Sequence, residues 1–376
     1  MKLPDCPHRP PCPGCPRYGE RGVAPEARLL LARLAEEAGL PEPVVREGEG
    51  EGFRLRARLM VRGRAASPKV GIFQEGSHRI VDIPRCRVHH SRINEVAAAV
   101  KEAIRATGVA PYAERPHRGD LRAVQIAVER AGGRAQVVLV GNAATADPLL
   151  GLATELRAAL GEALQGLWWN GNAERTNAIL GSGWQHLAGE EALHERVAGV
   201  DVFYPPGAFG QSHAALADAL AARLRASVPD AARVAELYAG CGPIGLGLLS
   251  RCAEVRFNEV SPHGVEGLAL GLAARPEAEQ ARALLVPGPA GERLEILDGV
   301  DTVIVDPPRK GLDAEVLAAL ASRPPRLLIY ASCGPASFAR DARRLLDAGL
   351  RLVALEAWNL FPYTAHVETL ARFERS

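Results

Sequence analysis

The strongest constraint on the fold is a regular alternation of strand-like and helix-like segments that begins near residue 214. Apolar strand-like runs occur at RVAELYA, EVRFNEV, DTVIVDPP and RLLIYAS, and a helical pattern follows each of them. Such alternation predicts a parallel sheet with helices on both faces. The chain then closes on two adjacent strand-like runs, RLVALEAWNLF and HVETLARFER. We therefore predict the α/β class, with a Rossmann-like sheet that is closed by an antiparallel hairpin.

The first half of the chain has a different pattern. The run FRLRARLMVRGR alternates apolar residues with arginines, which predicts a half-buried strand with an arginine face. With the segments around it, this run indicates an α+β region. We predict two domains, an N-terminal α+β domain at 1–205 and the α/β domain at 206–376. The other elements expected in the first domain are helices at 25–39, 91–107 and 148–164 and strands at 121–129 and 134–141.

Charge is unevenly distributed along the chain. The 45 Lys and Arg residues nearly balance 44 Asp and Glu, which excludes a uniformly basic nucleic-acid packaging protein. Between Arg54 and Arg134, however, 17 Lys or Arg stand against 7 Asp or Glu. This basic region is expected either to bind nucleic acid or to be solvated surface in an arginine-rich protein. No apolar run reaches the roughly 18 residues of a membrane span, and no signal-peptide pattern is found, so we expect a cytoplasmic protein with no membrane partner.

A glycine-rich turn follows the strand RVAELYA. Gly240 and Gly242 permit a tight turn and the close approach of a ligand, and Glu259 ends the next strand, where a carboxylate can accept ribose hydroxyls. The turn lacks the complete GxGxxG spacing, and Glu236 just before it would repel a pyrophosphate. An acidic group there suits a ligand with a cationic amino-acid part. S-adenosylmethionine therefore fits better than NAD, and a turn without a ligand is the alternative.

A cysteine and a carboxylate stand at two strand ends. Cys333 follows RLLIYAS and precedes Gly-Pro, so it is expected at the rim of the sheet, whereas Cys241 and Cys252 are expected only to pack. Glu368 lies at the start of the last strand; an exposed strand carboxylate is its alternative. A thiolate near a sulfonium suits methylation of carbon 5 of a pyrimidine, because addition to carbon 6 makes carbon 5 nucleophilic and a base then removes its proton. Cys333 is the predicted nucleophile and Glu368 the predicted base.

Four further cysteines form a separate pattern near the N-terminus. Cys6, Cys12 and Cys15 lie in a proline-rich segment that can form neither a helix nor a sheet ladder, and Cys86 follows about seventy residues later. Four thiolates can hold zinc or an iron–sulfur cluster, and the uneven spacing favours the cluster, since zinc sites more often use paired CxxC turns. We expect the group to be structural because no flavin or nicotinamide motif accompanies it. Four unligated thiols are the alternative.

Five segments together resemble the successive motifs of the RNA uracil-5-methyltransferase family, over nearly the whole chain. They are FGQSH at 209–213, ELYAGCGPIGL, DPPRKGL, YASCGPASFARD and FPYTAHVETL. The resemblance implies a class I S-adenosylmethionine-dependent fold with Cys333 as nucleophile and Glu368 as base. It also implies contacts to S-adenosylmethionine from Gln211, Tyr238, Glu259 and Asp306.

The chain resembles in particular the short type of the ribosomal-RNA branch, which has no N-terminal oligonucleotide-binding barrel. Members of that branch carry a 4Fe-4S cluster on the four-cysteine pattern, so the resemblance implies this cluster here. The chain departs from the family at Gly334, where Asn is usual, at Pro243, and at residues 286–291, where a polar residue often meets the adenine. These departures bear on the cofactor contacts more than on the chemistry.

The function we predict is methyl transfer from S-adenosylmethionine to carbon 5 of a uridine in 23S rRNA by a monomeric enzyme. The alternative substrate is transfer RNA. A second alternative is a cluster-bearing RNA-binding protein that has lost activity, and the presence of both Cys333 and Glu368 argues against it.

Overall fold

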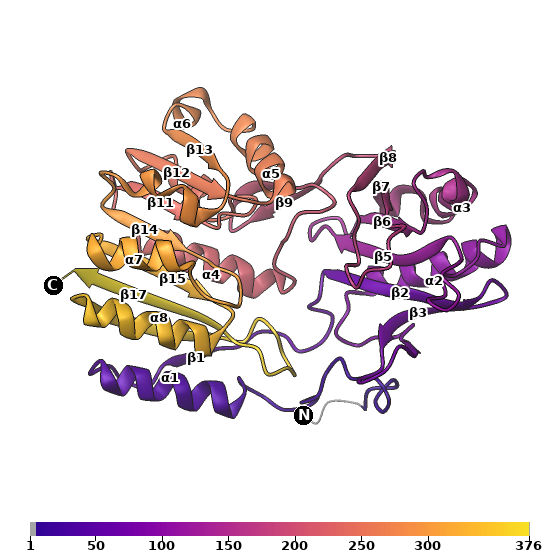
Figure 1. The fold of residues 1–376 in the computed structure, drawn as a ribbon, viewed down its shortest axis with the longest axis horizontal. Helices are drawn as coiled ribbons and strands as arrows, with labels where there is room; N and C mark the ends of the chain where they lie inside the picture. The colour runs from indigo at the N-terminus through magenta and orange to yellow at the C-terminus, as the bar shows by residue number, and fades with distance from the viewer. Residues whose placement is uncertain (1–4, 376) are drawn as a thin grey trace. The chain divides into compact units, whose positions relative to one another are not determined.

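The computed structural model describes residues 5–375, and these form two units (Figure 1). Unit 1 comprises the chain up to Gly19 together with Glu49–Glu195. Unit 2 comprises Glu20–Gly48 together with the chain from Arg196 onward. The division differs from the expected boundary between residues 205 and 206, chiefly because the segment Glu20–Gly48 joins the C-terminal unit.

Unit 2 is built on an eight-stranded sheet with the order β1-β16-β17-β15-β14-β11-β12-β13. The five strands from β13 to β15 are parallel, and β17 runs antiparallel to both β15 and β16. The Rossmann-like sheet and its closing antiparallel pair are thus observed, with β17 inserted between β15 and β16. The strands are β1 (Val44–Arg46), β11 (Arg233–Leu237), β12 (Glu254–Glu259), β13 (Ala283–Pro287), β14 (Thr302–Val305), β15 (Leu327–Ser332), β16 (Leu350–Trp358) and β17 (Glu368–Arg375).

Three helices share one apolar core with this sheet. Buried side chains of α1, α7 and α8 pack together with those of β11, β14, β15 and β17. Helix α5 packs against β12 outside this core, and the glycine turn after β11 is followed only by a 3-10 turn (Gly245–Leu248), where a longer helix was expected. The helices are α1 (Pro25–Glu37), α4 (Ala214–Ala226), α5 (Pro262–Ala273), α6 (Glu277–Gln280), α7 (Ala314–Ser322) and α8 (Pro335–Asp347).

The segment before β2 belongs to unit 2 because of its apolar residues. Leu31 and Leu34 of α1 are at most 1% exposed and lie in the same core as α8. Strand β1 then pairs in parallel with β16, from Val44 beside Glu356 to Arg46 beside Trp358. This pairing covers an edge of the sheet that would otherwise present unpaired backbone groups.

Unit 1 is built on a seven-stranded sheet with the order β4-β3-β2-β5-β6-β7-β8. All neighbouring strands are antiparallel except β6 and β7, which helix α3 connects. A separate two-stranded sheet pairs β9 (Leu193–Val197) with β10 (Val200–Tyr204), where the chain passes into unit 2. The other elements are β2 (Arg56–Arg64), β3 (Ser67–Phe73), β4 (Ile80–Asp82), α2 (Ser91–Thr107), β5 (Leu121–Val128), β6 (Ala135–Gly141), α3 (Leu150–Leu160), β7 (Leu164–Gly171) and β8 (Gly183–Gly189).

Helix α2 shows how local sequence signals set an element of unit 1. The His90 side chain accepts a hydrogen bond from the backbone amide of Arg92 at the start of the helix, and Gly108 adopts the left-handed conformation at its end (φ 72°). Val96, Val100 and Ile104 recur at helical spacing and are fully buried. In the part of the chain that the structure describes, we find no helix that combines the length and the apolar character needed to cross a membrane.

Candidate active site

The sheet of unit 2 brings together three chemically active side chains that are far apart in the sequence. Register pairs Ser332 of β15 with Thr369 of β17, so the next residues outward, Cys333 and Glu368, are neighbours at this edge. Asp306 follows the end of β14, which runs parallel to β15 and therefore ends at the same edge. The predicted nucleophile, the predicted base and Asp306 thus meet at the carboxyl ends of the parallel strands, where open α/β sheets bind ligands.

Glu368 is a buried carboxyl group without a hydrogen-bonding partner. Its side chain is 1% exposed, and neither Oε1 nor Oε2 accepts a hydrogen bond within the described residues. Burial, followed by the nearby charge of Asp306, raises the pKa of Glu368 well above its usual value. Burial likewise raises the pKa of Asp306 to about 6. An unsatisfied buried carboxyl is costly, and such groups cluster at functional sites.

Cys333 is half-buried on the loop between β15 and α8. Burial is the main cause that raises the pKa of its thiol to about 11; the negative charges of Glu368 and Asp306 add to it, and Arg309 opposes it. The fully buried Ser332 fixes the loop, since its Oγ accepts a hydrogen bond from the amide of Gly334 at 3.2 Å. This raised pKa favours the thiol over the thiolate at neutral pH.

Gly334 fits this loop because it has no side chain. A Cβ at this position would lie 2.6 Å from the carbonyl oxygen of Arg309 and 2.6 Å from Ser337 Oγ. Ser337 Oγ itself donates to that carbonyl at 2.7 Å, so the glycine, the first turn of α8 and the Arg309 loop are packed together. A residue with a Cβ would require one of these segments to shift.

Asp341 of α8 holds the loop that carries Asp306. It is fully buried, and its Oδ2 accepts hydrogen bonds from the amide of Leu312 at 2.9 Å and from the Tyr330 hydroxyl at 2.8 Å. Its Oδ1 accepts from Arg340 Nε at 2.9 Å. Sequence reasoning missed Asp341. The available signal was an acidic residue on the helical stripe that Phe338 and Leu345 mark as apolar.

The predicted cofactor residues of the glycine turn have the expected backbone geometry. Gly240 and Gly242 have φ values of 58° and 77°, in the left-handed region that favours glycine. Glu259 is 8% exposed; its Oε2 accepts from the amide of Gly240 at 2.7 Å, and its Oε1 accepts from the amides of Val260 and Ser261 at 2.8 and 2.6 Å. Three of the carboxylate's roughly four acceptor positions are therefore occupied by the backbone.

Tyr238 and Glu236 occupy less ordinary environments. Tyr238 has φ 60°, uncommon for a residue with a side chain, and its hydroxyl donates to Asp313 Oδ2 at 3.1 Å. This bond ties the glycine turn to the loop after β14. Glu236 is 2% exposed, its Oε2 has no partner among the described residues, and burial raises its pKa to about 8. A Cβ at Gly245 would collide with that oxygen.

Gln211 and its neighbour Phe209 precede α4. Gln211 is half-buried, and its side chain has no hydrogen-bonding partner within residues 5–375. The structure does not connect Gln211 by a polar contact to the other predicted cofactor residues. Phe209 is 71% exposed, an unusual position for a large apolar side chain.

The four N-terminal cysteines line a single cavity in unit 1. Its volume is about 100 Å³, and Arg54 also lines it. Burial, followed by the charges of neighbouring thiols, raises the pKa of Cys15 to about 11. Within residues 5–375, no three His, Cys, Asp or Glu side chains are arranged to hold a single metal ion. The cysteines that share the cavity are Cys6, Cys12, Cys15 and Cys86.

The sequence is similar to a known protein family and to several RNA methyltransferases. The family model for tRNA (Uracil-5-)-methyltransferase matches residues 293–375. An uncharacterized RNA methyltransferase of Protochlamydia amoebophila is 35% identical over 98% of this chain and 97% of its own length. One of Gloeobacter violaceus is 33% identical over 98% of this chain and 84% of its own length.

A solved structure shares the fold. The crystal structure of Pyrococcus abyssi tRNA (uracil-54, C5)-methyltransferase in complex with S-adenosyl-L-homocysteine superposes with a TM-score of 0.78, at 24% identity. The match covers 96% of this chain and 85% of the other. The sequence similarity extends over nearly the full length of the Protochlamydia relative. The family model covers β14 to β17 together with the loops of Asp306, Cys333 and Glu368. The chain therefore belongs to the RNA uracil-5-methyltransferase family.

Proposed function

We propose that the chain methylates carbon 5 of a uridine through a covalent adduct on Cys333. The observation that carries this proposal is that Cys333 lies next to Glu368, beyond the Ser332–Thr369 pair, and that neither oxygen of this buried carboxyl has a partner within the described residues. A thiol and an adjacent base are the two groups that this chemistry needs. No other cysteine of unit 2 is suitable, because Cys241 and Cys252 are each 1% exposed.

The proposed reaction has three steps: addition of sulfur to carbon 6, methyl transfer to carbon 5, and loss of the carbon 5 proton with release of the sulfur. The Cys333 thiol loses its proton, and the sulfur adds to carbon 6 of the uracil ring, which leaves an enolate with electron density at carbon 5. S-adenosylmethionine, a substrate consumed in each turnover, supplies the methyl group to carbon 5. Glu368 then takes the proton from carbon 5, and the electron pair of that bond reforms the ring double bond as the sulfur leaves. The products are 5-methyluridine, S-adenosylhomocysteine and a proton.

The high pKa of Glu368 suits this order of events. Burial and the nearby charge of Asp306 raise the pKa of Glu368 and so favour its protonated form, which lessens the repulsion between negative charges as Cys333 ionises. A carboxylate with a raised pKa is also a stronger base toward carbon 5 than an ordinary one. Glu368 must lose its own proton before that step, and the proton of the thiol must leave the site as well.

We assign the binding of S-adenosylmethionine to the glycine turn and its neighbours. Glu259 has about one acceptor position left for a ribose hydroxyl, and Glu236 offers an unpartnered oxygen close to the turn. A cationic ammonium group would compensate the buried charge of Glu236. The other residues assigned to this pocket are Gln211, Tyr238, Gly240, Gly242 and Asp306.

We also propose that Cys6, Cys12, Cys15 and Cys86 hold a 4Fe-4S cluster. The support is that all four line one cavity in a proline-rich region that has little secondary structure to order it. A cluster keeps its ligand sulfurs further apart than a single ion does, which is compatible with the absence of single-ion spacing within the described residues. Bound there, the cluster would crosslink the N-terminal segment to the loop after β4.

The RNA target has two candidates. The four-cysteine pattern favours 23S rRNA, whereas the name of the matching family model favours transfer RNA. Mapping 5-methyluridine in both RNAs from cells with and without the gene distinguishes them. We expect one position in 23S rRNA to lose its methyl group; loss from transfer RNA alone would assign the second candidate.

Metal content tests the cluster assignment. Protein purified without oxygen is expected to be brown and to contain about four irons per chain. Colourless protein with one zinc per chain would contradict the assignment.

A further inference from the structure

One face of the seven-stranded sheet in unit 1 carries no helix. Helices α2 and α3 contact each other, so they lie on the same face of the sheet. On the other face, Met60, Ala123, Val138 and Val140 form a core cluster that contains no residue of either helix. We call this the helix-free face.

Strand register identifies the side chains on the helix-free face. Arg58 of β2 pairs with Gln125 of β5, Gln125 with Val138 of β6, Val138 with Trp168 of β7, and Trp168 with His186 of β8. These residues form one row across five strands, with a cation at one end and two aromatic rings at the other. Arg58 Nε donates to Gln125 Oε1 at 2.7 Å, which orients the guanidinium along the face.

The β2 end of this face is positively charged. Four of the five β2 positions that project to this side carry arginine, and Met60 is the fifth. The arginines form two pairs, Arg56 with Arg58 and Arg62 with Arg64, and the members of each pair lie about 6.8 Å apart along the strand. This separation within a pair is comparable to that of neighbouring phosphates along an extended nucleic-acid strand. Arg62 is paired with Glu114, but Arg58, Arg64 and Lys69 are exposed and have no carboxylate partner within the described residues. Lys69 of β3 pairs with Arg62 in the ladder and so belongs to the same face.

The β7 and β8 end of the face is aromatic. Trp168 and Trp184 are half-buried and pack against the apolar cluster. The ring of His186 lies 4.9 Å from that of Trp168, with an interplanar angle of 48°. Cations beside aromatic rings are the combination that proteins use for single-stranded nucleic acid, whose bases expose their faces for stacking. A duplex offers no such base faces.

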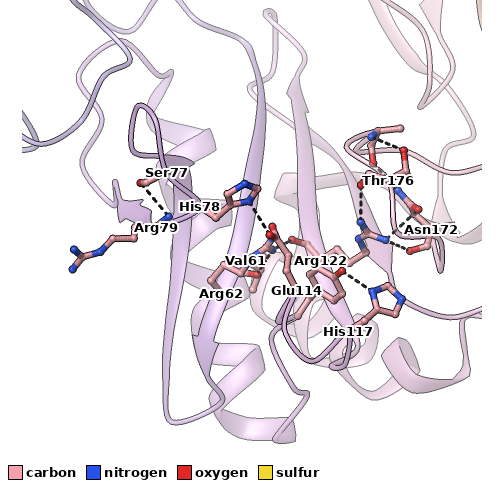
Figure 2. Close-up of polar contacts among 12 residues, drawn as sticks. Val61, Arg62, Ser77, His78, Arg79, Glu114, His117, Arg122, Asn172 and Thr176 are labelled. Carbon is pink, nitrogen blue, oxygen red and sulfur yellow. Dashed lines mark hydrogen bonds and ion pairs between the residues drawn. The ribbon is translucent and has the colours of Figure 1, made fainter.

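A well-fixed loop lies across this face between β7 and β8. Ile179 and Leu180 of the loop pack on the apolar cluster, and residues 173–178 are exposed. Arg122 is only 8% exposed and donates to the carbonyl oxygens of Asn172 and Glu174 at 2.6 and 2.7 Å. Figure 2 shows this guanidinium directed at the loop, where it also reaches the carbonyl of Thr176. Buried charge used in this way gives an irregular exposed loop one defined shape.

A stack of side chains connects the loop to β2. Two guanidinium groups lie over the Tyr112 ring, that of Arg122 at 4.6 Å and that of Arg62 at 5.0 Å from its centroid. Glu114 accepts from Arg62 at 3.0 Å, and the Tyr112 hydroxyl and His117 Nδ1 are 2.7 Å apart. The cationic strand and the loop therefore belong to one rigid frame.

We propose that the helix-free face is the docking surface for the single-stranded RNA that flanks the target uridine. Arg58, Arg64 and Lys69 contact phosphates, Trp168 provides a stacking surface, and residues 173–178 contact the strand that crosses them. This inference rests on the proposed function only in taking RNA as the substrate. It assigns the affinity for RNA to unit 1, separately from the chemistry of Cys333.

Binding of RNA at different salt concentrations tests the proposal. The probe is a fluorescently labelled single-stranded oligonucleotide of mixed sequence, and the protein is the full-length chain with its metal content verified. The variant is Arg58→Gln/Lys69→Gln. Its control is Arg105→Gln/Arg157→Gln, which removes the same charge from α2 and α3 on the opposite face.

Each lost phosphate contact lowers the slope of log affinity against log salt by about 0.7 for a single strand, so the variant's slope should be shallower by about 1.4. Raising the salt fourfold then costs the unmodified protein about sevenfold more affinity than it costs the variant. The control should keep the unmodified slope. An unchanged slope in the variant, or an equal change in the control, overturns the proposal. An unchanged slope is also the result expected if the helix-free face binds another protein and not RNA.

A second readout separates this inference from the proposed function. At saturating RNA that contains 5-fluorouridine, the variant should still form the Cys333 adduct as the unmodified protein does. If no adduct forms with either protein while the salt slopes differ as expected, the mechanism fails and the docking surface stands. If adducts form and the slopes are equal, the docking surface fails and the mechanism stands.

Discussion

Replacing Asp341 with asparagine should loosen the loop that carries Asp306 without emptying any space in the core. The carboxylate of Asp341 is fully buried and accepts from the Leu312 amide and the Tyr330 hydroxyl at 2.9 and 2.8 Å. Asparagine keeps one acceptor oxygen but loses the charge, and its amide group meets Arg340, which also donates.

The expected cost follows from these contacts. A hydrogen bond to a charged group contributes about 1.5–3 kcal/mol and one between neutral groups about 0.5–1.5 kcal/mol, so two bonds lose about 2 kcal/mol. The contact with Arg340, whose side chain is 57% exposed, adds at most about 1 kcal/mol. We therefore expect Asp341→Asn to lower the local free energy of opening by about 2–3 kcal/mol.

Native-state hydrogen exchange measures this opening directly, because the Leu312 amide is itself one of the donors. A loss of about 2–3 kcal/mol corresponds to about 30- to 150-fold faster exchange in the loop after β14. The control is Arg340→Gln, which removes the exposed partner of the same pair and should change exchange by less than about fivefold. If Asp341→Asn alters exchange no more than Arg340→Gln does, Asp341 does not hold the loop.

Three further predictions concern the titrating groups and the glycine of the active site. Glu368→Gln removes a carboxyl charge beside Cys333, so the pKa of that thiol should fall below about 11. Alkylation of Cys333 by iodoacetamide should then begin at lower pH, and an unchanged pH profile would show that the charge of Glu368 does not raise the pKa of Cys333. Burial raises the pKa of Glu236 from 4.5 to about 8, so the folded protein binds more protons than the unfolded chain between these values and loses stability as pH rises through them. In Glu236→Gln the fall in the free energy of unfolding across that window, measured by urea unfolding, should be smaller than in the unmodified protein, with Asp306 and Glu368 accounting for the remainder; an unchanged fall would show that Glu236 does not contribute to it. Gly334→Ala should lower kcat at least tenfold, since its Cβ would lie 2.6 Å from the Arg309 carbonyl; full activity would show that the loop adapts without cost.

The sheet of unit 2 was largely predictable because its signals are local. Strands β11, β12, β14 and β15 are short apolar runs that a helical pattern follows in the sequence, and two final runs without a helix indicated the antiparallel pair, whereas β13 (Ala283–Pro287) was not predicted. Cys333 and Glu368 were identifiable because each lies at a strand end beside residues that interrupt the strand. Their adjacency in the ladder, next to Ser332 and Thr369, required the order in which β17 inserts beside β15.

Other features depend on packing between distant segments, which periodicity does not reveal. The helix at Pro25–Glu37 was expected in the first domain, but its apolar stripe packs with α8. Arg54 was expected on an arginine face and instead lines the cavity of the four cysteines. The role of Asp341 follows from its hydrogen bonds with Leu312 and Tyr330, which lie in other parts of the chain. Each of these depends on a tertiary contact rather than on a local pattern.

The central claim is that Cys333 bonds to the uracil ring, and intact-mass spectrometry of the protein with RNA containing 5-fluorouridine tests it most directly. In 5-fluorouridine, fluorine replaces the hydrogen on carbon 5 that Glu368 would remove as a proton. Glu368 therefore cannot complete the reaction, and the adduct persists. With S-adenosylmethionine present, we predict a stable protein–RNA species whose crosslinked peptide contains Cys333, and none with Cys333→Ser. Methylation of ordinary RNA without any trapped species on the fluorinated RNA, or a crosslink at another residue, would contradict the mechanism.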